Sequence, residues 1–217
     1  MVKLNLTADI NEQAVISEIV KALSRKINSV FTGMQTDGVL RSELGDFAER
    51  QIRNSPEFDS LLSGELKAAF GLIESATILG LIISTVKRNI FIDATPVKVV
   101  GAVISASLTV GILLDDFQDV LALPGTAYSS NGGEVRWLEW LLVKGDSIVI
   151  SNYSLKVDVG NTTSRTGDAI MVKSNRGFRV PPEYAGGVSN NWLTRCFEET
   201  EGIVGNILRL DFIRRFV

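Results

Sequence analysis

Apolar residues recur at helical spacing through the first third of the chain and predict three helices. Between Asn11 and Phe31 they follow steps of three and four residues, the repeat of an amphipathic helix, and Gly33 predicts its end. A second helical pattern covers about 39–52. Pro56 then suits the first turn of a third helix, because proline lacks the amide hydrogen that an interior helical residue donates. Residues 1–9 alternate apolar and polar and predict a short strand or an extended arm.

The least polar window runs from Ala68 to Val86 and contains a single charged residue, Glu74. A membrane span requires about twenty apolar residues, so one interpretation of this window is a transmembrane helix. The carboxylate of Glu74 and the glycines Gly71 and Gly80 favour the other interpretation, a helix or strand buried in a protein core.

Strand-forming residues follow from Ile90 to Leu114, where Val, Ile, Thr and Ala predict two or three strands. The acidic cluster Asp115, Asp116 and Asp119 follows. It lacks the alternating oxygen ligands and central glycine of a calcium loop, so a solvated turn is the favoured interpretation.

The rest of the chain predicts a loop, a short helix, two strands and a long final helix. These are expected at 124–133, 135–142, 148–159, 169–172 and from about Ser189 onward. Together the elements predict an α+β fold with a helical N-terminal region, a central antiparallel or mixed β-sheet and a long C-terminal helix. We expect a single domain over 1–217, with a helical part at about 10–70 and a β-rich part with the C-terminal helix at about 90–217.

Composition narrows the chemistry that the chain can perform. The sequence contains no histidine, which excludes Ser-His-Asp triads, Cys-His pairs and histidine-ligated zinc. Cys196 is the only cysteine, and its apolar neighbours Trp192 and Phe197 predict a buried small side chain. The net charge of −3 argues against a general nucleic-acid-binding surface. We therefore expect a protein that is not an enzyme, with no cofactor, no metal and no catalytic residue.

The segment from Ser164 to Arg195 is locally basic on an otherwise acidic chain. Its prolines stiffen an extended stretch that also carries arginines and aromatic residues, and such a stretch loses little entropy when it docks on a partner. The segment 160–187 and the loop 124–133 are thus the predicted interface elements. The predicted interface residues are Arg165, Gly167, Arg176, Arg179, Pro181, Pro182, Tyr184 and Arg195.

Three stretches of the C-terminal third resemble a known family, the neck and tail-completion proteins of tailed bacteriophages. They are WLEWLL at 137–142 with Gly145 and the strand after it, SRTG-x-AIM at 164–171, and RVPPEYAG at 179–186 with NNWLTR at 190–195. The first seventy residues carry a looser likeness, in a long helix followed by IRNSPEF and GELKAAFGL. The apolar middle of the chain departs from the family.

This resemblance implies an α+β virion protein of the head–tail junction, assembled in the host cytoplasm. It also implies a homo-oligomeric ring that docks connector or portal-side proteins onto tail-tube proteins. DNA would pass through the ring without specific recognition, and neither a cofactor nor catalysis would be involved.

Two alternatives come from other classes of protein. The first is a membrane-anchored or membrane-active protein that uses 68–86 as its span. The second is a carboxylate-dependent enzyme such as a glycosidase, for which Glu183 and Asp168 are candidates. The run Glu198, Glu199 and Glu201 is expected on the solvated side of the last helix, where it lines no cleft.

Overall fold

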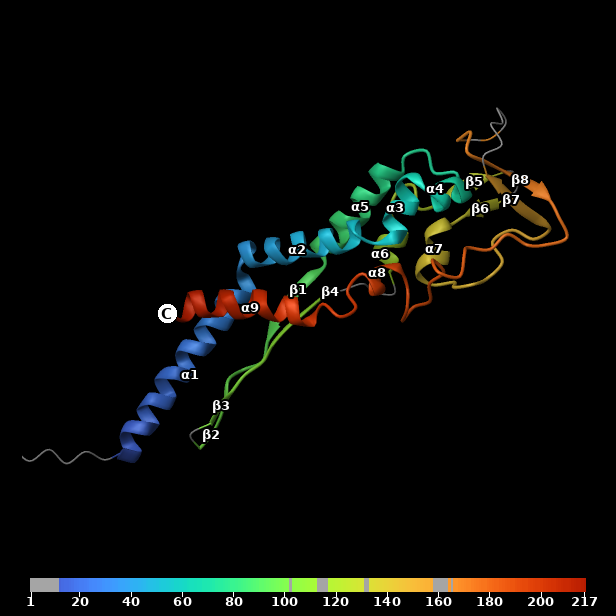
Figure 1. The fold of residues 1–217 in the computed structure, drawn as a ribbon. Coiled ribbons are helices and arrows are strands. Elements are labelled where there is room, and N and C mark those ends of the chain that lie inside the picture. The colour runs from blue at the N-terminus through green and yellow to red at the C-terminus, as the bar shows by residue number, and fades with distance from the viewer. Residues whose placement is uncertain (1–11, 102, 113–116, 131–132, 158–163, 165) are drawn as a thin grey trace, which may run out of the picture. The chain divides into compact units, whose positions relative to one another are not determined.

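The computed structural model describes residues 12–101, 103–112, 117–130, 133–157, 164 and 166–217. It combines helices with short strands, which confirms the α+β class (Figure 1). Contacts divide the chain into two compact units, each formed by separate stretches of sequence. The first unit holds the described residues up to Arg41, with Phe91–Gly111 and Gly205–Val217; the second holds Ser42–Ile90 and Ile112–Val204. The single domain over 1–217 stays a prediction, and the arm expected at 1–9 lies outside the described residues.

Aromatic contacts between α1 (Glu12–Thr36) and the end of α9 (Glu201–Phe216) hold the first unit together. The rings of Phe31 and Phe212 meet edge to face with centroids 5.7 Å apart, and Phe216 stacks on Phe212 at 5.3 Å. Val30 and Met34 are buried in this second half of α1. The long C-terminal helix that the sequence predicts therefore covers only the end of the first helix.

The helix end predicted at Gly33 is wrong, since α1 continues to Thr36. A glycine inside a helix costs about 1 kcal/mol relative to alanine. Burial of a side chain such as Met34 contributes roughly 1.5–3 kcal/mol, so the helix continues past the glycine. The chain turns at Asp37 instead, where the carboxylate accepts hydrogen bonds from the Val39 amide (2.8 Å) and from the guanidinium of Arg215.

Four short strands of the first unit form a ribbon of two successive pairs. Strand β1 (Ile90–Ala94) pairs with β4 (Leu108–Ile112), and β2 (Lys98–Val100) pairs antiparallel with β3 (Val103–Ser105). The sequence predicted two or three strands here. Between the pairs, the Ser107 amide donates to Thr95 Oγ1 at 2.9 Å and keeps the ribbon continuous. The β2–β3 end is exposed on both faces apart from the half-buried Ile104.

The second unit is built around a group of short helices. Helix α2 (Gly38–Arg53) confirms the second predicted helix, and Pro56 occupies the first turn of α3 as expected. The helices that follow are α3 (Pro56–Ser63), α4 (Glu65–Phe70), α5 (Ser75–Arg88), α6 (Gln118–Leu121), α7 (Trp137–Leu142) and α8 (Trp192–Arg195).

The apolar window at 68–86 is divided between two helices. Helix α4 ends at Gly71, which adopts the left-handed conformation that favours glycine, and α5 begins at Ser75. The buried side chains of α5 recur at helical spacing and are Ile78, Leu79, Ile82, Ile83 and Val86. This confirms the interpretation as a buried helix. Among the helices in the described ranges, none is both long and apolar enough to cross a membrane.

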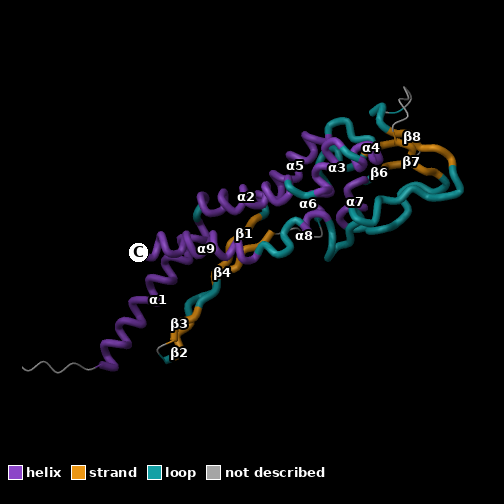
Figure 2. The backbone as a smooth tube through the Cα atoms, in the orientation of Figure 1, coloured by secondary structure: helices purple, strands orange, loops and turns teal. Residues whose placement is uncertain are grey.

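Two further strand pairs complete the second unit. Strand β5 (Tyr128–Ser130) pairs with β6 (Gly133–Val135), so part of the loop predicted at 124–133 is a hairpin. Strand β7 (Tyr153–Val157) pairs antiparallel with β8 (Ala169–Lys173). Figure 2 shows the strands as separate short pairs, and the predicted central sheet is replaced by four two-stranded sheets.

The strand predicted at 148–159 starts five residues later than expected, at Tyr153. Ile150 instead makes an isolated bridge with Phe178, whose amide donates to the Ile150 carbonyl at 2.8 Å. Backbone groups that bond to another segment leave the β7–β8 ladder, and the strand is shorter for this reason.

The final helix predicted from Ser189 is also wrong at its start, because two helices occupy this region. The carbonyl of Thr200 accepts from the amides of Ile203 and Val204 and opens α9, while Glu199 has a positive φ of 58°. Glu198 and Glu199 thus lie at the break between α8 and α9 and not along a continuous helix.

Two leucines of α5 test whether this helix is buried on one side, as a core helix is. Leu79 is 1% exposed and Leu81 is 37% exposed. We expect Leu79→Ala to lower the free energy of unfolding by about 2–5 kcal/mol, through lost burial and a cavity, and Leu81→Ala to lower it by less than about 1 kcal/mol. Urea unfolding of the two variants measures the difference. Equal losses would contradict the one-sided burial of α5.

Candidate functional site

Three of the segments that carry the resemblance, IRNSPEF, RVPPEYAG and NNWLTR, meet at Arg195, the last residue of α8. Its guanidinium donates to Glu57 Oε1 from Nε at 3.1 Å and from Nη2 at 2.6 Å. The remaining donors reach the carbonyls of Tyr184 and Ala185, each at 3.3 Å, and Asn190 Oδ1 at 3.1 Å. We call these five residues the Arg195 cluster. It joins α3, the RVPPEYAG segment and α8 through one planar cation.

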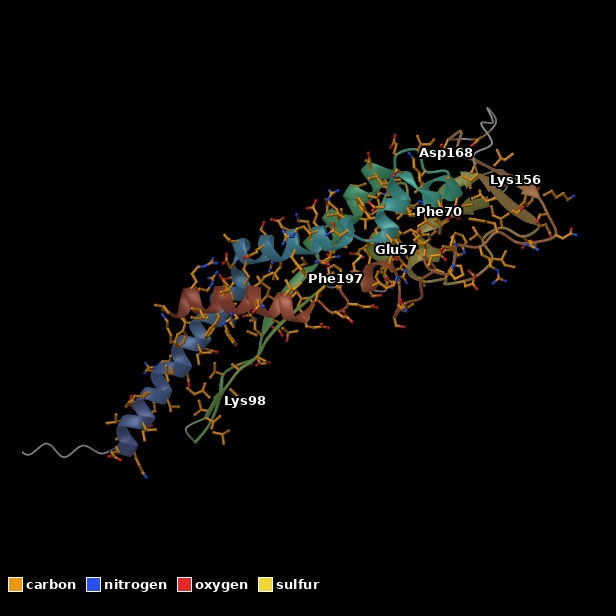
Figure 3. All side chains as sticks on the ribbon, in the orientation of Figure 1. Glu57, Phe70, Lys98, Lys156, Asp168 and Phe197 are labelled. Atoms are coloured by element: carbon orange, nitrogen blue, oxygen red, sulfur yellow. The ribbon has the colours of Figure 1, made fainter. Side chains whose placement is uncertain are left out.

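Burial makes the cluster important for stability. The Glu57 side chain is 4% exposed and that of Arg195 is 25% exposed. Burying a carboxylate so deeply costs free energy unless a cation and hydrogen bonds replace its lost hydration, and Arg195 supplies both. Glu57 also lies in the first turn of α3, where the positive end of the helix dipole favours a negative charge. Figure 3 labels Glu57 at α3.

Ser55 provides a second link between α3 and α8. As the N-cap of α3, its hydroxyl accepts from the Phe58 amide at 3.2 Å and donates to the Ile52 carbonyl at 2.8 Å. The indole Nε1 of the fully buried Trp192 also donates to this hydroxyl, at 2.8 Å. Asn191 opens α8 with a capping box to Thr194, which fixes the direction in which Trp192 and Arg195 project.

Gly186 allows the RVPPEYAG segment to lie against α7. Its amide donates to the Trp140 carbonyl at 3.0 Å, and its carbonyl accepts from the Gly145 amide at 2.8 Å. A Cβ atom at Gly186 would overlap the carbonyl oxygen of Leu141. Only glycine fits at this close approach of two backbones, so WLEWLL and RVPPEYAG pack as one unit.

Pro181, Pro182 and Tyr184 form the turn that leads into the Arg195 cluster. The Pro181 carbonyl accepts from the amides of Tyr184 (2.9 Å) and Ala185 (3.1 Å), while Pro182 is exposed. Arg179 precedes the turn and donates to the Asp146 carboxylate at 3.1 Å. Both partners of that ion pair are more than half exposed, so the pair contributes little to stability.

Gly167 and Arg176 lie at opposite ends of β8. Gly167 has a positive φ of 83° in the turn before the strand, where its amide donates to Ser164 Oγ at 3.1 Å. Arg176 is exposed after the strand, and its amide donates to Ser174 Oγ at 2.9 Å. The predicted interface residue Arg165 lies outside the described residues. Figure 3 labels Lys156 and Asp168 on the β7–β8 ribbon.

The predicted interface residues therefore fall into two groups. Pro181, Tyr184 and Arg195 come together at the Arg195 cluster, and Pro182 marks the exposed side of the same turn. Gly167, Arg176 and Arg179 lie on exposed turns and are not brought together with them by any contact among the described residues. Arg195 serves an internal ion pair, a role that its basic sequence context did not indicate.

Sequence reasoning missed Glu57 and Ser55. The Asn-Ser-Pro-Glu stretch contained a signal for Ser55, since a serine before a proline at a helix start is a common N-cap. No local pattern pairs Glu57 with Arg195, because 138 residues separate them.

The other chemical candidates have structural roles. Partial desolvation raises the pKa of the Cys196 thiol to about 11, and the side chain is half-buried, not fully buried as its apolar neighbours predicted. Asp119 accepts a hydrogen bond from the Asn89 side chain, while Asp115 and Asp116 lie outside the described residues. Within the described ranges, no group of three cysteine, aspartate or glutamate residues is placed to hold a metal ion.

The chain matches no protein-family model, no curated protein and no solved structure.

Arginine replacements test the Arg195 cluster. We expect Arg195→Ala to lower the free energy of unfolding by about 3 kcal/mol, because it leaves the buried Glu57 carboxylate without its cation. The control Arg179→Ala removes an exposed ion pair and is expected to cost less than about 1 kcal/mol. Adding Glu57→Gln to Arg195→Ala should recover part of the loss. Chemical denaturation measures all three, and equal costs for the two arginines would refute this role.

Thiol reactivity tests the burial of Cys196. With a pKa of about 11, its thiolate population at pH 8 is about a hundredfold lower than that of a thiol at its ordinary value of 9.0. We expect iodoacetamide to alkylate the native protein at least about a hundredfold more slowly than the urea-unfolded chain at the same pH. Mass spectrometry follows the modification. Comparable rates in the two states would show that Cys196 is accessible.

Proposed function

We propose that this chain is a structural virion protein of a tailed bacteriophage, a neck or tail-completion component of the head–tail junction. It assembles as a homo-oligomeric ring and docks connector or portal-side proteins onto tail-tube proteins. It acts within the virion, after assembly in the host cytoplasm, and uses no cofactor and no catalytic residue.

One observation carries the proposal: the segments of the family resemblance other than SRTG-x-AIM contact one another in the second unit. IRNSPEF contributes Ser55 and Glu57, which bind Trp192 and Arg195 of NNWLTR. RVPPEYAG binds WLEWLL through Gly186. The rings of Phe70, in GELKAAFGL, and Trp137 lie 5.6 Å apart. Segments that form one packed core support the resemblance as a set better than any of them does alone.

The surface of the second unit also suits docking. Around the β7–β8 ribbon, four cationic side chains are exposed: Lys156, Lys173, Arg176 and Arg179. Arg179 pairs with Asp146, and Asp168 is an exposed acid just before β8, so the ribbon carries an excess of cations. Such an excess steers an acidic partner into register and raises the rate of association. Because the whole chain has a net charge of −3, this local basic surface favours a protein partner over a long nucleic acid.

The overall acidity fits a ring through which DNA passes without being held. Specific recognition of bases requires several side chains aimed into a groove, together with a phosphate-binding basic surface. The proposal therefore includes DNA as transient cargo and connector and tail proteins as the stable partners.

Light scattering on the purified protein, alone and mixed with candidate connector and tail proteins, tests the proposal. We expect a homo-oligomer that closes as a ring and joins these partners. Arg176→Glu should weaken the docking about tenfold, since it reverses an exposed charge of the basic surface. Its melting temperature should be unchanged, because no side-chain hydrogen bond holds Arg176 within the described part of the chain.

Arg50→Glu is the matched control, because Arg50 is exposed on α2 in the same unit. We expect it to leave docking unchanged. A strictly monomeric protein that joins neither connector nor tail proteins would refute the proposed function. Equal effects of the two charge reversals would refute the role of the ribbon surface alone.

A further inference from the structure

The first half of α1 exposes a row of apolar side chains that the described residues of the first unit do not cover. Val15, Ile16, Ile19 and Leu23 are all exposed, and Ile19 is 52% exposed. Their steps of three and four residues place them along one face of the helix. The contacts with Phe212 and Phe216 begin only in the second half of α1, so α9 leaves this row open.

The β2–β3 hairpin covers only one flank of this helix. A groove of about 860 Å³ lies between them, and Ile16, Val20 and Val99 supply its apolar lining. Val15, Ile19 and Leu23 do not line the groove. An amphipathic helix normally buries its apolar stripe, and contiguous exposed apolar surface marks an interaction site. Among the described residues of this unit, the row is therefore an apolar surface left open to a partner.

The charges at the two ends of the exposed row indicate which partner it binds. Val15 and Leu23 lie four residues on either side of Ile19, and Glu12 and Lys26 lie seven residues on either side. Steps of four and seven keep all five residues on one helical face, which we call the α1 face. Its two ends thus carry opposite charges around an apolar centre.

We propose that the α1 face binds the α1 face of a second copy of this chain, with the two helices antiparallel about a two-fold axis at Ile19. This arrangement places Val15 against Leu23 of the second copy and Glu12 against Lys26 of the second copy, at both ends. A parallel pair would place Glu12 against Glu12 and Lys26 against Lys26, which opposes like charges. The antiparallel pair is therefore the one that the charges favour.

The neighbouring contacts leave Lys26 able to take part. Its ammonium lies 6.0 Å from the centre of the Phe216 ring, the outer limit of a cation–π contact, and its side chain is exposed. The ion pair of Glu18 with Lys21, at 2.8 Å, lies off the α1 face, with Glu18 on its flank and Lys21 on the opposite side of the helix. It stays intact in the proposed dimer.

This contact does not rest on the proposed function and is distinct from a ring contact. A ring closes through two different surfaces of each subunit, whereas a two-fold contact uses the same surface twice and stops at two copies. The α1 face would thus join two chains in solution, and two subunits of separate rings where rings form.

Sedimentation velocity of charge variants tests the proposal. We expect Glu12→Lys and Lys26→Glu each to weaken the dimer at least about tenfold, and the double variant Glu12→Lys/Lys26→Glu to restore it. Ile19→Asp should abolish it, with the helical circular dichroism unchanged because Ile19 is exposed. The exchanged pair Glu18→Lys/Lys21→Glu is the control and should leave the dimer unchanged.

Cysteine cross-linking tests the antiparallel direction. Under mild oxidation, Ile19→Cys should link to itself, and Val15→Cys should link to Leu23→Cys in a mixture but not to itself. The half-buried native Cys196 serves as the unreactive background. Self-linking of Val15→Cys would indicate a parallel pair and overturn the arrangement.

The remaining outcomes separate this inference from the proposed function. A ring that forms equally well with Ile19→Asp, without any two-fold dimer of the native chain, would overturn the α1 contact and leave the proposed function standing. Loss of the dimer with retention of the ring would support the contact. If Ile19→Asp changed only the binding of the protein to vesicles of anionic phospholipid, the occupant would be a membrane surface, and the proposal would be wrong.

Discussion

The second unit depends on a carboxylate placed where water cannot stabilise it. Glu57 would be strongly unfavourable in its buried position without the guanidinium of Arg195. That guanidinium also binds the carbonyls of Tyr184 and Ala185 in the loop that passes beside it. A lysine could neutralise the charge, but it could not span the same set of acceptors with a fixed geometry. The ion pair thereby ties α3 to α8 and to the loop that the Pro181 turn and Gly186 hold against α7.

Local pattern predicted the elements whose burial repeats along their own sequence. Helix α2, the Pro56 start of α3 and the strand β8 follow this rule, and so does the buried face of α5. The wrong predictions of element boundaries share a cause: contacts with a segment distant in sequence determine where the helix ends or the strand begins. Gly33 does not end α1 because Met34 is buried beyond it, and the strand expected from Ile148 starts late because Ile150 bonds with Phe178.

The candidate site was predictable only in part, for the same reason. The proline-stiffened stretch and its arginines were visible in the sequence, and Arg176 and Arg179 are indeed exposed. The role of Arg195 depends on its ion pair with Glu57. The residues next to Glu57 in the sequence predict a helix start, and none of them indicates a buried ion pair. The sequence shows whether a residue is positively or negatively charged. Whether that residue contacts a partner at the surface or forms an internal ion pair depends on which residues the fold places beside it.

The contact between Asp37 and Arg215 closes the first unit across 178 positions of the chain. On a ribosome, the N-terminal helix therefore emerges long before the segment that packs against its second half. During that interval Val30, Phe31 and Met34 have no native cover, and the entropy of closing so long a loop delays the contact further. The second unit can begin to fold in the meantime, so the first unit closes only after α9 has emerged. The second half of α1 is thus left without its aromatic partners, Phe212 and Phe216, until the segment that carries them has been made.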